Sequence, residues 1–98
     1  MSFTKISCQA LGISHGDFFR IIPRLFPEAA LTVSKGGVTL EWGREKAIEI
    51  TIGEEKKRIL GLLEFPTTDV YFAFSNCSSA FTDSFMTIFH RGFQKGGG

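Results

Sequence analysis

The stretch Ile48-Glu49-Ile50-Thr51-Ile52 alternates apolar and polar side chains along its whole length. Successive side chains of a β-strand point to opposite faces of the sheet, so this alternation predicts a strand with one buried side and one wet side. A sheet with one wet face is typical of antiparallel pairing, because parallel sheets are covered on both faces. The stretch therefore predicts an antiparallel sheet.

Short runs of the same kind, separated by turn residues, lie on both sides of this strand. Lys35-Gly36-Gly37 supplies the positive φ angles of a tight hairpin, and Gly53-Glu54-Glu55-Lys56 is typical of another turn. Residues 58–65 leave little polar surface on either side, which predicts a strand that is central or covered on both faces, and Pro66-Thr67-Thr68 is expected to end it. The predicted strands cover residues 3–10, 31–33, 38–42, 48–52, 58–65 and 69–74.

A short helix is expected after the first strand. Ser14 can cap its N-terminus, with Asp17 three residues later as the capping-box partner, so His15 is the first helical residue. Pro23 removes a backbone donor, and the regular helix should stop or kink there. The apolar side of this segment is expected to pack on the sheet.

The last part of the chain returns to a helical period. Ser78 or Ser79 can cap this second helix, and His90 and Arg91 place positive charge at its C-terminal end. A continuous apolar stripe on one side of the helix consists of Phe81, Phe85, Ile88, Phe89 and Phe93.

The fold class is therefore α+β, with two layers: an antiparallel sheet of about five strands, in the order β-α-β-β-β-β-β-α, and a long C-terminal helix. Residues 1–95 form a single domain, and residues 96–98, Gly-Gly-Gly, form a flexible tail. By fold-level analogy, the order of elements resembles the TATA-binding-like half-domain and a short helix-grip fold.

Composition excludes several classes of protein. The formal net charge is +1 over 98 residues, which favours neither nucleic acid nor an anionic membrane as a partner. No apolar run approaches the roughly 20 residues of a membrane-spanning helix. Cys8 and Cys77 lie too far apart in sequence for a zinc or redox motif, and we expect two free thiols in a small, soluble, cytoplasmic protein.

The sequence carries no catalytic motif. His15 and Asp17 could form an acid/base pair, but residues i and i+2 of a helix do not face each other, and both are good capping or first-turn residues. His90 is expected to be a surface residue that complements the helix dipole. We therefore assign no catalytic residue, cofactor or metal ligand, and an enzyme is not expected.

Two functions from different classes remain. The first is a non-enzymatic binding or self-association module, whose eleven Phe residues build an apolar core between sheet and helix. Such a module would bind an apolar small ligand in a residual cleft, or a second copy or another protein through a sheet edge. The alternative is a carrier or modifier protein activated at Gly98, because unbranched Gly-Gly ends can thread into an activating enzyme. Mixed charges at Arg44–Lys46 and Glu54–Arg58 make nucleic acid an unlikely partner.

Overall fold

The computed structural model describes residues 5–93, which form a five-stranded antiparallel sheet and two helices. The expected two-layer α+β class, about five strands and a C-terminal helix are thus confirmed. In chain order the elements are β1 (Lys5–Leu11), α1 (His15–Leu25), β2 (Ala30–Ser34), β3 (Gly37–Trp42), β4 (Lys46–Leu60), β5 (Leu63–Ser75) and α2 (Ser79–Gly92).

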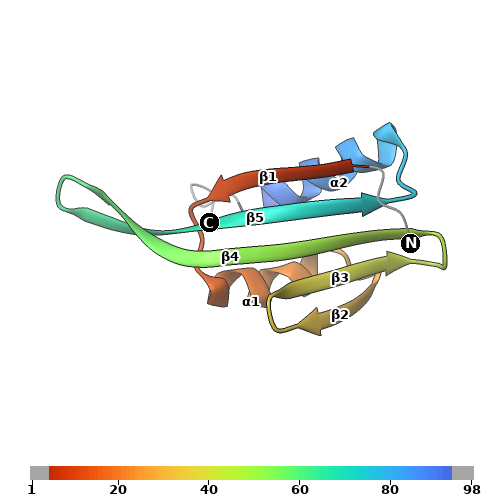
Figure 1. Ribbon diagram of the computed structural model, residues 1–98, viewed down its shortest axis with the longest axis horizontal. Coiled ribbons are helices and arrows are strands. Elements are labelled where there is room, and N and C mark those ends of the chain that lie inside the picture. Colours follow the sequence, from red (N-terminus) through yellow and green to blue (C-terminus); the bar gives the residue numbers. More distant parts are fainter. Residues whose placement is uncertain (1–4, 94–98) are drawn as a thin grey trace.

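The strands lie in the order β1-β5-β4-β3-β2, so the first strand inserts beside the last. Both helices lie behind the sheet in Figure 1 and cover one of its faces. We call this the inner face, and the opposite one, which neither described helix covers, the helix-free face. Ile48, Ile50 and Ile52 point inward and are buried, whereas Glu49 and Thr51 are exposed on the helix-free face, as their alternation predicts.

Helix α1 begins where the sequence predicts. The Ser14 side chain accepts a hydrogen bond of 3.1 Å from the backbone N–H of Asp17, which satisfies one of the unpaired donors at the helix start. Of the two outcomes expected at Pro23, the stop is wrong, because the helix continues to Leu25, and the kink stays a prediction. Pro23 lies in the last turn, where its missing donor removes one hydrogen bond, and burial of Ile22 and Phe26 on either side favours the continued helix.

Helix α2 is capped by Ser78, whose hydroxyl accepts from the Phe81 N–H. Of the predicted apolar stripe, Phe85, Phe89 and Phe93 are buried and Phe81 is half-buried. Ile88 is the exception: it is 39% exposed, because it lies at the margin of the helix face that meets the sheet.

Phenylalanine rings occupy the space between the layers. The Phe89 ring stands edge-on to Phe72 of β5 at a centroid distance of 5.0 Å, and Phe85 stacks on Phe26 at 4.6 Å. Edge-to-face and offset arrangements of this kind are the favoured geometries of aromatic pairs. The core is thus closely packed in the region where a ligand cleft was one expectation.

The region between residues 53 and 68 differs most from the prediction. Gly53–Lys56 is not a turn: β4 continues through it with a register shift between Ile52 and Glu55, which is a β-bulge. Pro66 does not end a strand but lies inside β5. The chain reverses at Gly61-Leu62 instead, in the middle of the segment predicted to be a covered central strand.

The predicted tail, residues 96–98, lies outside the described residues, as do residues 1–4. Neither of the two described helices is long and apolar enough to cross a membrane.

Candidate interaction surface

Strands β4 and β5 extend past their neighbours as a two-stranded arm. The last pair between β3 and β4 is Gly37 with Thr51, and the last between β1 and β5 is Leu11 with Thr68. From Lys56–Thr67 to Leu60–Leu63, the two strands pair only with each other among the described residues. Figure 1 shows the arm projecting from one end of the sheet. We call residues 55–68 the arm and the rest of the sheet with its helices the body.

A tight turn closes the arm. Gly61 has φ +61°, a value that side-chain-bearing residues rarely adopt, and it takes the first central position of the two-residue connection between Leu60 and Leu63. Glycine at this position is typical of a type II′ hairpin turn.

Large apolar side chains are exposed along the arm. Leu62 at the tip is fully exposed, and Leu60 and Leu63 beside it are 53% and 60% exposed. Ile59 and Phe65 are exposed as well. Single apolar residues on a surface are common, but a contiguous group of this size is typical of an interaction site.

The helix-free face of the body adds a second apolar area next to the arm. Cys8 of β1 pairs with Tyr71 of β5, and Ile6 pairs with Ala73, so these four side chains share the helix-free face. Ile6 and Tyr71 are exposed. Phe65 of the arm lies six residues from Tyr71 along β5, so exposed apolar residues of body and arm follow one strand.

The charged residues of the arm and of the body strands differ in sign. By the strand register, Lys56 and Arg58 share one face of the arm, whereas Glu41, Glu49 and Asp69 lie on the helix-free face of the described body strands. That face of the arm is therefore basic, and the helix-free face of the body is acidic. On the opposite face of the arm the signs are mixed, because Lys57 forms an ion pair of 3.7 Å with Glu64.

A groove lies where the arm leaves the body. Its lining includes Leu60, Phe65 and Pro66 from the arm and Ala10 and Phe93 from the body, and its volume is about 780 Å³. Arg58 and Asp17 add one charge of each sign. The groove is open to solvent and offers room for a side chain of a docked protein next to the apolar arm.

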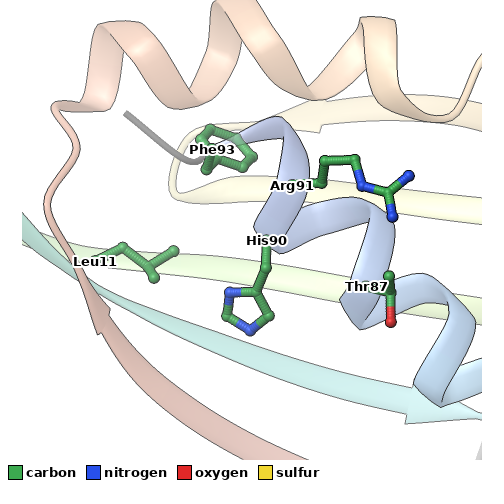
Figure 2. A pocket seen from close by; sticks show the side chains of 5 residues that line it. All are labelled: Leu11, Thr87, His90, Arg91 and Phe93. Atoms are coloured by element: carbon green, nitrogen blue, oxygen red, sulfur yellow. The ribbon is translucent and has the colours of Figure 1, made fainter. Parts of the chain in front are cut away.

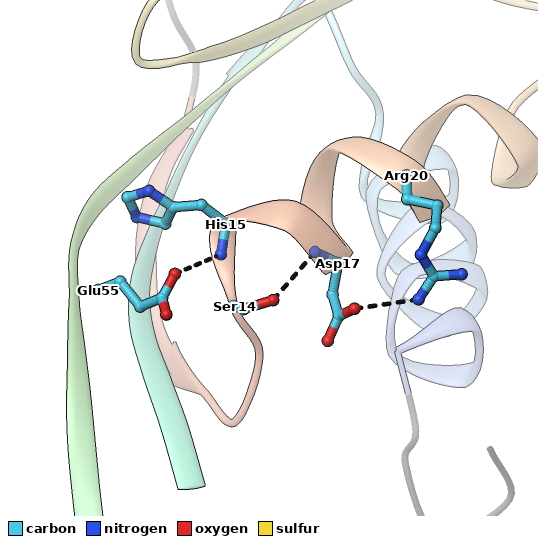
Figure 3. A network of polar contacts seen from close by, with 5 residues as sticks. All are labelled: Ser14, His15, Asp17, Arg20 and Glu55. Carbon is cyan, nitrogen blue, oxygen red and sulfur yellow. Dashed lines mark hydrogen bonds and ion pairs between the residues drawn. The ribbon is translucent and has the colours of Figure 1, made fainter.

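The start of helix α1 fastens the base of the arm (Figure 3). The His15 backbone N–H donates to the Glu55 carboxylate at 2.8 Å, and the His15 ring Nε2 lies 2.7 Å from the Gly53 carbonyl oxygen at the bulge. The bulge thus sets the direction of the arm, and the contacts of His15 hold the base of the arm against the body.

The sequence raised His15 and Asp17 as a candidate acid/base pair, and the structure separates their side chains. In Figure 3 the His15 ring points toward β4, while the Asp17 carboxylate points along the helix toward Arg20. Asp17 and Arg20 form an ion pair of 3.0 Å. Both residues are engaged in fastening α1, and their arrangement offers no shared reactive position.

His90 lines a separate open pocket of about 630 Å³ at the C-terminal end of α2, with Leu11, Thr87, Arg91 and Phe93 (Figure 2). His90 is exposed, as predicted. The pocket lies at the end of the helix that carries partial negative charge, which disfavours a bound anion despite the nearby guanidinium group of Arg91. We assign no chemistry to it.

The cysteines are two free thiols that lie apart. Cys8 is exposed on β1, and Cys77 is half-buried in the connection between β5 and α2, where burial raises the pKa of its thiol. Within residues 5–93 no three His, Cys, Asp or Glu side chains come together as a metal site.

The arm is the feature that sequence reasoning missed. The signal was present in Gly61, a lone glycine between apolar residues of two equal strand segments, but the continuous apolar run from Ile59 to Leu63 favoured a buried strand. A scan against protein-family models and searches of curated proteins and of solved structures found no match to this chain.

Proposed function

We propose that the protein is a non-enzymatic, cytoplasmic self-association module that binds a second copy through its arm and the helix-free face. The observation that carries this proposal is the exposure of Leu60, Leu62 and Leu63 on a part of the chain that contributes nothing to the core. Burying apolar surface is favourable by roughly 25 cal/mol per Å². Folding leaves these side chains in water, so only association with a partner would release this free energy.

The arm suits such a role because it is shaped before binding. Its strands are paired along six residue pairs, and the bulge and His15 fix its base. A contact element that is ordered in the free protein avoids part of the entropy cost of association.

The proposal differs from the expected ligand-binding form of the module. The phenylalanine rings that were to line a cleft instead contact one another between the layers, as Phe72 and Phe89 do. The contact through a sheet edge that the sequence suggested becomes a contact through the sheet face, where the exposed apolar residues lie.

Sedimentation equilibrium tests this function. We expect the unmodified chain to form dimers in a concentration-dependent manner and the double variant Leu60→Ser/Leu63→Ser to remain monomeric with unchanged circular dichroism. Ile88→Ser is the matched control, since it removes an exposed apolar side chain from α2, away from the helix-free face. An unmodified chain that stays monomeric up to about 1 mM, the Kd of a very weak complex, contradicts the proposal.

Activation at Gly98 stays a prediction as the alternative function. Its residues lie outside the described part of the chain, and no structural observation favours it. Deleting Gly96 to Gly98 should leave folding and self-association unchanged. If the chain is a carrier, only the full-length protein will gain an adenylate mass when incubated with ATP and an activating enzyme.

A further inference from the structure

We infer that, in the self-association proposed above, Leu62 at the tip of each arm enters the groove at the base of the other copy's arm. The inference rests on that proposed function and adds to it the side chain and the site that meet. It makes Leu62 and the groove the features that determine how two copies are arranged.

The tip presents a leucine that its own fold does not use. Leu62 is fully exposed and takes the second central position of the turn, directly after Gly61. Turns are formed mostly by small and polar residues, so the turn itself does not require a leucine at this position. Because paired strands hold the turn on both sides, Leu62 has a fixed place before any partner binds.

The groove has walls that suit an apolar side chain. Leu60, Phe65 and Pro66 line it from the arm, and Ala10 and Phe93 line it from the body. Leu62 keeps its full exposure, so it does not fill the groove of its own copy. The volume of about 780 Å³ is larger than one leucine side chain, and the turn can therefore enter together with Leu62.

The charges of the groove also favour an uncharged occupant. Arg58 and Asp17 are its charged lining residues, and their signs cancel. A groove without net charge attracts neither an acidic nor a basic partner. The tip, residues 61–63, carries no charge and thus matches the groove in polarity.

A two-fold axis between two antiparallel arms forms both contacts at once. Leu62 and Pro66 are four residues apart, which is about 13 Å at roughly 3.3 Å per residue. Two arms that lie side by side over this length bring each tip to the base of the other arm. A one-sided contact would leave one tip and one groove open and would continue into a chain of copies, whereas the reciprocal contact closes the dimer.

The basic residues of the arm favour the same orientation. Lys56 lies near the base of the arm, away from the closing pair of Leu60 and Leu63. Arms that run in the same direction would set Lys56 of the two copies side by side. Antiparallel arms place the two lysines at opposite ends of the contact, and this separation avoids the repulsion of like charges.

A double-mutant cycle tests whether the tip and the groove meet. The tip variant is Leu62→Ser, and the groove variant is Ala10→Trp, which adds a large side chain to the groove wall. Leu62 and Ala10 are both exposed, so neither change removes buried area. Each homodimer loses both contacts, and we expect its Kd to rise by about tenfold for each contact, or about a hundredfold in all. A chain with both changes should bind no more weakly than either single variant, because both changes act on the same contacts.

A mixture of the two single variants tests the reciprocal arrangement. In the heterodimer, Leu62 of the groove variant still meets the intact groove of the tip variant, so one of the two contacts survives. Its Kd should lie about tenfold above that of the unmodified dimer and about tenfold below that of either variant homodimer. Sedimentation equilibrium measures these values, and native mass spectrometry counts the heterodimers.

Ile59→Ser is the matched control. Ile59 is an exposed apolar residue of the arm, but successive side chains of a strand point to opposite faces, and Ile59 lies outside the groove lining that Leu60 joins. Its Kd should change by less than about threefold, and its effect should multiply with that of Ala10→Trp. Circular dichroism establishes that each variant is folded. If Ala10→Trp does not fold, Thr67→Trp on the same groove replaces it.

The outcomes separate the two proposals. If the loss in the double variant equals the product of the single losses, tip and groove contact different parts of the partner, and the arrangement is overturned while self-association remains. Unchanged dimers of Leu62→Ser or Ala10→Trp also overturn it, as does a mixture that associates no better than its components. Monomers of the unmodified chain overturn the proposed function itself.

Discussion

Strands β4 and β5 run through both body and arm, yet their apolar residues are used in opposite ways in the two regions. In the body, β4 and β5 carry their buried Ile and Phe residues on the inner face, and the helices cover that side. In the arm, the same strands carry Leu60, Leu62 and Leu63 with no helix over them in the described chain. Apolar content alone therefore does not indicate a core, because what decides burial is whether another layer lies above the strand.

If the body alone holds the buried core, substitutions there should have the largest effect on the free energy of unfolding. Truncating Phe89→Ala or Phe85→Ala should lower the free energy of unfolding by about 3–5 kcal/mol, since each removes a buried ring. Chemical denaturation measures this loss. Thr39→Ala and Glu49→Ala on the helix-free face are the controls, and denaturation midpoints equal to theirs would contradict the assignment of the two faces.

How far the sequence predicts the fold depends on the same distinction. The cap at Ser14, the start of α1 and the alternation of Ile48–Ile52 are local features, and each is confirmed. The arm was not predicted because its local pattern resembles that of a buried strand, and burial depends on which segments lie next to it in space. Sequence periodicity describes a strand, but not what covers it.

Two breaker residues illustrate the limit. Pro66 was expected to end a strand, but it lies past the last pairing of β1, where β5 has a free edge that tolerates a proline. Gly53 was expected in a turn, but a bulge accommodates it and re-aims the strand. Both residues lie near the base of the arm, and neither ends a strand.

The second largest effect is expected where α1 meets this boundary. Ser14→Ala removes the acceptor for the Asp17 N–H and should cost about 1 kcal/mol of stability. Ser14→Asp, which restores an acceptor, is the control for a pure capping effect. If the loss is equal for both variants, the contribution of Ser14 does not come from the cap.

A smaller effect is expected in the pH dependence of stability, which should differ between the half-buried Cys77 and the exposed Cys8. Burial raises the pKa of the Cys77 thiol above its ordinary value of 9.0, so the folded protein holds this proton more tightly than the unfolded chain does. The resulting stabilisation is complete below pH 9.0 and decreases as the pH rises through the folded pKa. Cys77→Ala should therefore lose less stability between neutral and alkaline pH than the unmodified chain. Cys8→Ala, at an exposed position, is the control and should keep the alkaline loss.

The smallest effect is expected at the tip of the arm. Leu62 is fully exposed, so Leu62→Ser removes no buried area and should change the free energy of unfolding by less than about 0.5 kcal/mol. The positive φ of the turn belongs to Gly61, and the substitution adds no backbone strain. Denaturation at low protein concentration isolates this folding term from association, whereas sedimentation at high concentration should show weaker dimers of the same variant. A loss of 1 kcal/mol or more in the monomer would mean that the tip packs on its own body. The contrast between a buried apolar body and an exposed apolar arm would then be wrong, because Leu62 would contribute to folding and would not be available to contact a partner.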